Sequence, residues 1–118
     1  MDFEQRFVDM ATSLDFAIFV LEQLNRPYDT RYRKMFGEYM VYVNDKPVLL
    51  LCDNTAFVKK LECVEPYLKD APTGFPFKGA REHYILDVEN PELLDIVVTE
   101  LEKVTPVPKP KSKKKKQL

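Results

Sequence analysis

The alternation of apolar and polar positions is clearest between residues 31 and 52, where it predicts three consecutive strands. Along residues 39–43, successive side chains point to opposite faces, and both faces are at least partly apolar. Asn44-Asp45 tolerates positive φ and suits a tight hairpin turn, and the apolar run 48–52 is typical of a strand buried centrally in a sheet. Gly37 lies between the first two strands, where we expect a kink or a bulge.

Helical periodicity precedes these strands. It predicts a short amphipathic helix over residues 3–10 and a second helix from about 13 to 24, with Thr12 as the N-cap of the second. The second helix is apolar on most of its surface, so it needs cover on more than one side. We favour the first helix as that cover, and a second subunit is the alternative. The main stripe comprises Leu14, Ala17, Ile18 and Leu21, and the candidate partner or dimer face comprises Phe16, Phe19 and Val20.

The second half of the chain mixes helix and strand signals. Asp53-Asn54-Thr55 predicts the cap of a helix that ends near residue 61, with Phe57, Val58 and Leu61 on its inner side, followed by a helical turn at 64–68. Residues 71–79 contain two prolines and predict a loop or a broken edge strand. A last strand is expected at 83–88, and Asn90-Pro91 predicts the start of a helix that ends before Pro106.

This order of elements favours an α+β fold. We expect an antiparallel sheet, made of the three-strand meander and one or two later strands, with helices packed on one face. The chain of 118 residues is long enough for one domain with its own core. The expected organisation is an N-terminal helical extension at 1–12, the α+β domain at 13–104 and a disordered Pro/Lys-rich tail at 105–118.

The charge of the chain is strongly asymmetric. Its formal net charge is only −1, but six lysines lie in the last ten residues, and the other 108 hold 12 basic and 19 acidic residues. Such a tail would bind nucleic acid weakly, independently of sequence and with strong salt dependence. A charge run is more often simply solvated, or it folds back on an acidic body. The lysines are Lys109, Lys111, Lys113, Lys114, Lys115 and Lys116.

The start of the meander resembles a known motif. Its sequence, from Arg33 to Tyr39, is similar to the arginine-rich Met-Phe-Gly-Gly motif in the N-terminal domain of the TfoX (Sxy) competence regulators. The resemblance extends from about residue 13 to 104, with Glu38 in place of a second glycine and a lysine tail in place of a helical second domain. It implies an α+β domain, often dimeric, that acts in the bacterial cytoplasm in transcriptional control of DNA uptake. The matching residues are Arg33, Lys34, Met35, Phe36, Gly37 and Tyr39.

Candidate chemistry is sparse. Cys52, Cys63 and the single histidine, His83, match no metal-ligand spacing, and two cysteines are too few for a disulfide framework. With three glycines in the chain, no phosphate-binding loop can be built. From the ligand spacing and the glycine count together, we expect neither a metal nor a cofactor. Cys52 closes a buried strand and should be inert, whereas Cys63 should be easier to reach. The first residues lack a signal-peptide pattern and no apolar run would cross a bilayer, which predicts a cytoplasmic protein with no membrane contact.

Two residue sets have both a functional and a structural interpretation. The first set consists of four cations, which would form a patch that binds phosphate or an acidic partner. Such cations more often lie on the solvent face of a strand, where they pair with acidic side chains. A second set, of tyrosines, would stack on nucleobases, but such side chains more often fill a sheet face or the rim of the core. We favour the structural interpretation of both. The cations are Arg31, Arg33, Lys34 and Lys46, and the tyrosines are Tyr32, Tyr39, Tyr42 and Tyr84.

The sequence therefore favours a non-enzymatic regulatory or adaptor domain that binds a protein partner or a second copy of itself. The basic tail would add nonspecific contact with nucleic acid. One alternative is a small enzyme that uses His83 in a pocket between the 72–79 loop and the meander. Another is a chaperone-like dimer that presents an apolar groove to a client segment.

Overall fold

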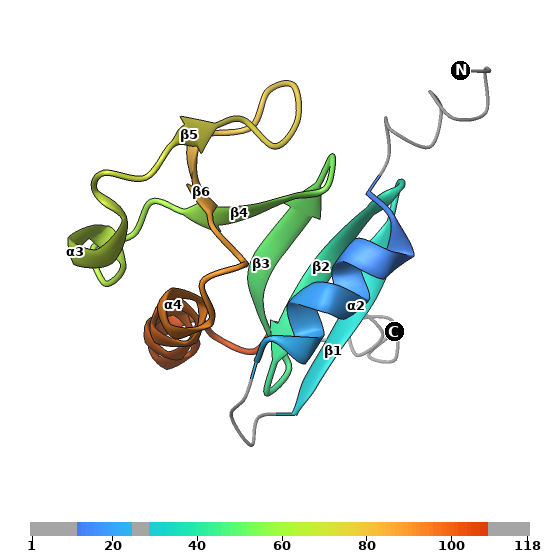
Figure 1. Cartoon of the computed structure of the whole chain (residues 1–118), viewed down its shortest axis with the longest axis horizontal. Helices are drawn as coiled ribbons and strands as arrows, with labels where there is room; N and C mark the ends of the chain where they lie inside the picture. The colour runs from blue at the N-terminus through green and yellow to red at the C-terminus, as the bar shows by residue number, and fades with distance from the viewer. Residues whose placement is uncertain (1–11, 25–28, 109–118) are drawn as a thin grey trace, which may run out of the picture.

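The computed structural model describes residues 12–24 and 29–108 of the chain. These residues form a six-stranded antiparallel sheet in the order β1-β2-β3-β4-β6-β5, with three helices packed on it (Figure 1). The α+β fold expected from the sequence is confirmed. The strands are β1 (Thr30–Met35), β2 (Glu38–Val43), β3 (Lys46–Cys52), β4 (Thr55–Lys59), β5 (Thr73–Gly74) and β6 (His83–Leu86), and the helices are α2 (Leu14–Glu22), α3 (Glu65–Leu68) and α4 (Pro91–Val104).

Three two-residue turns connect β1 to β4. Phe36-Gly37, Asn44-Asp45 and Asp53-Asn54 all have positive φ at both positions, between 51° and 83°. This backbone matches the twist of paired strands, and Asn, Asp and Gly tolerate it best. The prediction of a hairpin turn at Asn44-Asp45 is confirmed. Gly37, expected at a kink or bulge, is a turn residue instead, and the irregularity in pairing lies where β2 meets β3, after Val41.

The helix predicted from Asp53 to about Leu61 is wrong. Asp53-Asn54 forms a hairpin turn and residues 55–59 form β4, which pairs with β3 on one side and with β6 on the other. Asp and Asn serve equally as helix caps and as residues of left-handed turns, so the dipeptide alone does not distinguish the two. Pairing with β3 and β6 decides the outcome, because it satisfies the backbone of residues 55–59 within the sheet.

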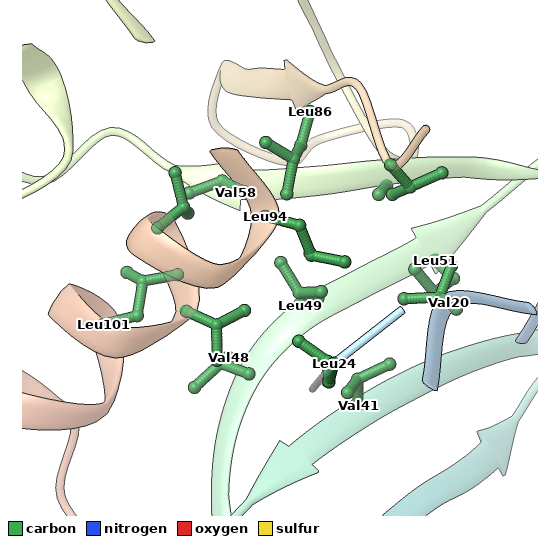
Figure 2. Packing of buried hydrophobic residues seen from close by; sticks show 14 of the residues in the cluster. Val20, Leu24, Val41, Val48, Leu49, Leu51, Val58, Leu86, Leu94 and Leu101 are labelled. Carbon is green, nitrogen blue, oxygen red and sulfur yellow. The ribbon is translucent and has the colours of Figure 1, made fainter. Parts of the chain in front are cut away.

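One face of the sheet carries the core. Along β2 the side chains alternate between buried and half-exposed, as the sequence predicts. The buried side chains of β2, β3, β4 and β6 join those of the helices in a single apolar cluster (Figure 2). We call this the inner face of the sheet. Fully or almost fully buried members include Val41, Val43, Leu49, Leu51, Val58, Leu86, Leu94, Val97, Val98 and Leu101.

Helix α4 begins where the sequence predicts. The Asn90 side chain accepts a hydrogen bond from the Leu93 backbone N–H at 3.1 Å, and Pro91 occupies the first turn, where its missing donor costs nothing. Four residues spaced along one face of the helix are buried in the core. The remaining later elements also agree with expectation, since α3 is a short helical turn, β5 is a two-residue edge strand and β6 is the last strand.

Helix α2 lies over the first two strands (Figure 1). Its cap and its buried stripe differ from those predicted. Ser13, not Thr12, is the N-cap, and its Oγ accepts from the Phe16 backbone N–H at 3.1 Å. Two residues of the predicted stripe are instead exposed, Leu14 at 44% and Ile18 at 38%. The fully buried residues of the helix are Ala17 and Val20.

The two edges of the sheet differ in length and charge. Strand β1 has six residues, and four consecutive ones, Arg31 to Lys34, are exposed. Strand β5, at the opposite edge, has only two. The predicted helix at 3–10 and the lysine tail lie outside the described residues. Within the described part of the chain, none of the helices has the length and apolar character that crossing a bilayer requires.

Candidate functional site

The face of the sheet opposite the core carries a row of apolar side chains. Strand pairing places Met40 opposite Leu50, Leu50 opposite Phe57, and Phe57 opposite Ile85. Residues directly opposite each other in antiparallel strands point to the same face, so the row crosses four strands. Met40, Leu50 and Ile85 are half-buried, and Phe57, although only 7% exposed, does not belong to the core cluster. We call this surface the outer face.

Cations flank the apolar row on both sides. On β1, Arg33 lies opposite Met40, and the Arg31 guanidinium sits 4.2 Å from the centre of the Tyr42 ring. On β4, Lys59 lies opposite His83. The outward positions of the six strands include a single carboxylate, Glu38, at the far end of β2. The outer face is therefore apolar in the middle and positively charged at its borders, whereas the body as a whole is acidic.

A groove of about 240 Å³ opens beside this row. Strands β3 and β4 pair only over residues 50–52 and 55–57, so their other halves diverge, and the C-terminal end of α4 closes the gap (Figure 1). Most of the lining is apolar, with one lysine and one histidine. The lining residues are Met40, Pro47, Val48, Leu49, Leu50, Phe57, Lys59, Leu61, His83, Leu101, Val104, Thr105 and Pro106.

His83 is held in one orientation at the wall of this groove. Its Nδ1–H donates to the Arg81 carbonyl oxygen at 2.8 Å, and its ring meets Phe57 edge-on with 6.3 Å between ring centres. A carbonyl oxygen can only accept, so this contact places a proton on Nδ1. This groove is not the pocket that the sequence suggested between the 72–79 loop and the meander, because none of residues 72–79 lines it.

A cluster of polar contacts fixes the entry to α2. The Glu38 carboxylate accepts from the Thr12 hydroxyl at 2.7 Å and from the Asp53 backbone N–H at 3.2 Å. The Asn54 side chain accepts from the Ser13 backbone N–H at 2.9 Å, and the Asn54 N–H donates back to the Thr12 hydroxyl at 3.3 Å. These bonds tie the start of α2 to the β3–β4 turn. The role of Glu38 in this structure is therefore a structural one.

Burial and the nearby Glu38 carboxylate raise the pKa of the Cys52 thiol to about 12. The thiol stays protonated and inert at neutral pH, as expected for a cysteine at the end of a buried strand. Burial also raises the pKa of Cys63, which is half-buried and therefore easier to reach than Cys52. Across residues 12–24 and 29–108, no cluster of three or more potential metal ligands is present.

The motif residues divide between the solvent and the core. Arg33 and Lys34 are exposed on β1, and Tyr39 is buried on the inner face. Phe36 is fully exposed at the tip of the β1–β2 hairpin, with φ of +51°. A bulky residue rarely adopts this left-handed conformation, so the tip presents an aromatic ring at some conformational cost. Gly37 follows it with φ of +83°, which glycine adopts freely.

The cation set proposed from the sequence does not form one patch. Arg31 is 3.4 Å from Asp45, and Lys46 is 3.0 Å from the Glu102 carboxylate on α4. Arg33 points to the outer face and Lys34 to the inner side of the sheet. The favoured interpretation, a strand surface paired in part with acids, is confirmed for Arg31 and Lys46.

The tyrosines do not form a stacking surface either. Tyr39 and Tyr84 are buried in the core, and Tyr32 meets Tyr39 edge-on with 5.5 Å between ring centres. Tyr42 is half-buried beneath Arg31. Among the proposed partner-face residues, Val20 is fully buried in the core and so is unavailable to a partner, which corrects that part of the prediction. Phe16 and Phe19 are half-buried against the core.

The sequence analysis missed the apolar row on the outer face. The signal was present only in part. The predicted hairpin at Asn44-Asp45 pairs the strand of Met40 with the strand of Leu50, but the shift in register after Val41 is what sets Leu50, and not Leu49, opposite Met40. Extending the row to Phe57 and Ile85 required recognition of β4 as a strand.

Comparison with known proteins finds a relative that matches this chain over most of its length. The chain is 34% identical over 111 residues to an "uncharacterized 12.7 kDa protein in trpE 5'region" from Spirochaeta aurantia, and the match covers 91% of this chain and 95% of the relative. The chain belongs to the family of this protein. No family model matches the sequence. No solved structure matches it either.

Proposed function

We propose that the chain is a non-enzymatic regulatory or adaptor domain that binds a protein partner, or a second copy of itself, through the outer face of its sheet. The observation that supports this proposal is the apolar row on that face. Its middle is half-open to solvent in the described structure, although such side chains are normally covered in a folded domain. A partner that covers Met40, Leu50 and the groove would remove this surface from water.

The proposal places the protein in the cytoplasm, in a role like that of the N-terminal half of the TfoX-type competence regulators. The motif from Arg33 to Tyr39 supports this likeness, and so does the α+β architecture with the motif at its first hairpin. In the same proposal the lysine tail adds nonspecific contact with nucleic acid. Its support is the sequence, which places six lysines in the last ten residues.

A matched pair of charge substitutions tests the role of the outer face. Met40→Glu places a carboxylate in the apolar row, and Ile96→Glu places the same group on the exposed side of α4. Sedimentation over a concentration series reports self-association, and quantitative affinity capture from an extract of the source cells reports a partner. We expect Met40→Glu to lose the association and Ile96→Glu to keep it. Equal binding by both variants would exclude the outer face.

A salt series tests the role of the tail. The full chain and a 1–108 truncation are titrated against a labelled oligonucleotide at several salt concentrations. We expect the full chain to bind with an affinity that falls by about 0.7 log units per log unit of salt for each phosphate contacted on a single strand. Binding that is unchanged by removal of residues 109–118 would contradict the role proposed for the lysines.

A further inference from the structure

The loop between β5 and β6 combines two exposed aromatic rings with two exposed cations. Phe75 is 64% exposed and Phe77 is 59% exposed, and Lys78 and Arg81 follow within four residues. Pro76 separates the two rings and restricts the backbone between them. Aromatic rings are expected to withdraw from water in a folded domain, so two adjacent exposed rings need a further explanation.

Both ends of this loop are anchored beside the groove. Gly74, just before Phe75, pairs with His83, which comes two residues after Arg81. Gly74 also lies so close to Phe57 and Ile85 that an added Cβ would approach their side-chain carbons at 3.4 and 3.3 Å. The loop therefore begins at β5 and ends at β6 (Figure 1), where His83 lies opposite Lys59 of β4.

The charge of this region is opposite to that of the rest of the described chain. Residues 59–60 and 75–83 hold four cations and one acid, Glu82, which Lys60 neutralises at 2.8 Å. The remaining described residues hold 6 basic and 15 acidic residues. Within the part of the chain that the structure describes, Lys59, Lys78 and Arg81 take part in no ion pair. Their charge is available to an anionic ligand.

The chain leaves the end of α4 along the wall of the groove. Thr105 and Pro106 line the groove together with His83 and Lys59. The first tail lysine, Lys109, follows Pro106 by three residues in the sequence. The lysine-rich part of the sequence therefore follows closely on two residues of the groove wall.

We propose that the 75–81 loop, with Lys59 and His83 beside it, is a stacking site for single-stranded nucleic acid. A ligand that contacts both the exposed rings and the unpaired cations must carry flat apolar surfaces and repeated negative charges. A single strand of nucleic acid has both. Its bases stack on Phe75 and Phe77, while its phosphates contact Lys59, Lys78 and Arg81. A duplex is bound less well, because its bases are not free to stack on the loop. This inference rests on the nucleic-acid part of the proposed function and assigns it a site on the folded domain.

Anisotropy titrations of the full 118-residue chain test the site. The probes are a fluorescent 20-nucleotide oligo(dT) and a duplex of the same length, each over a salt series. The variants are the double substitution Phe75→Ala/Phe77→Ala, the double substitution Lys78→Gln/Arg81→Gln, and Phe36→Ala as the matched control. Phe36 is an even more exposed ring, at the tip of the β1–β2 hairpin.

We expect the double phenylalanine variant to bind oligo(dT) at least about tenfold more weakly, with an unchanged salt slope, because stacking does not release counterions. The double cation variant should lower the salt slope by about 0.7 for each phosphate contact that is lost. Phe36→Ala should bind like the wild type. Duplex binding should be weaker than oligo(dT) binding and insensitive to the phenylalanine substitutions.

Three outcomes would overturn the site. If oligo(dT) binding survives the double phenylalanine substitution and disappears in the 1–108 truncation, the tail alone binds, and the proposed function stands without this site. If the full chain binds no oligonucleotide at low salt, both the site and the nucleic-acid part of the proposed function fail. If the full chain does not bind the oligonucleotide but binds vesicles that contain phosphatidylserine, and the Phe75→Ala/Phe77→Ala variant loses this binding, the loop contacts a membrane instead.

Discussion

Leu49 and Leu50 are neighbours on the same central strand, yet they meet opposite surroundings. Leu49 is buried in the core cluster that α2 and α4 help to form (Figure 2), whereas Leu50 is half-exposed in the apolar row on the outer face. The two faces share every strand and every backbone hydrogen bond. The difference shows that the helices stabilise the fold from one side and leave the other side available for contact.

The largest effect should come from the inner face. Leu49→Ala removes a fully buried side chain, and we expect it to lower the free energy of unfolding by about 3 to 4 kcal/mol, since such truncations typically cost 2–5 kcal/mol. Urea unfolding followed by circular dichroism measures the change. A loss below about 1 kcal/mol would mean that the inner face is not the dominant core.

A smaller loss is expected from the neighbouring residue on the outer face. Leu50→Ala should destabilise by about 1 to 2 kcal/mol, because its half-exposed side chain transfers less apolar area from water. The same substitution on the same strand makes the two variants a matched pair. If Leu50→Ala cost as much as Leu49→Ala, the outer face would be a second core rather than a free surface.

Substitution of the N-cap of α4 tests how much this cap contributes to the stability of the helix that covers the inner face. Asn90→Ala removes the acceptor of the Leu93 N–H and should cost about 1 kcal/mol, as N-cap truncations usually do. Asn90→Asp keeps an acceptor at the same position and should restore most of this loss. The midpoint of thermal unfolding of the three proteins is a sufficient readout. Equal midpoints for the Ala and Asp variants would show that the cap contributes little.

The smallest effect should be a pH dependence at the contact between α4 and the second hairpin turn. Hydrogen bonds from Lys46 and Asn44 lower the pKa of Glu102 below its ordinary value. Its folded carboxylate therefore contributes stability above the unfolded pKa, and this contribution is lost as the pH falls through the folded pKa. We expect wild type to be more stable than Glu102→Gln at pH 7 and the two to converge in acid. A gap that persists at pH 2 would point to a packing effect instead.

The parts of the fold that were predictable are those encoded locally. The hairpin at Asn44-Asp45 and the start of α4 at Asn90-Pro91 depend on the conformational preferences of the residues at those positions. β4 was missed because Asp53-Asn54 suits a cap and a turn equally, and only its partners, β3 and β6, decide between them. The buried stripe of α2 was misassigned for a similar reason, since the helix is apolar on most sides and the sheet selects the face.

The site was less predictable than the fold. Sequence analysis identified the motif and the tail, which are contiguous, but the outer row joins Met40, Leu50, Phe57 and Ile85 from four strands. Such a row appears only once the register of the sheet is known. The 75–81 loop is contiguous, and its interleaved aromatic and basic residues were a usable signal. It was missed because its prolines were used only to predict a loop or a broken edge strand. The exposure of its aromatic side chains depends on how the loop packs, which the sequence alone does not show.

The edges of the sheet limit how copies of this domain can assemble. An antiparallel pairing of two β1 strands would bring Arg31, Arg33 and Lys34 of each copy against those of the other, and like charges across a ladder repel. The opposite edge, β5, offers only two residues, too short a template for strand addition. Open-ended growth of the sheet into fibrils is thus disfavoured at both ends, so a crowded solution of this protein should resist amyloid-like aggregation.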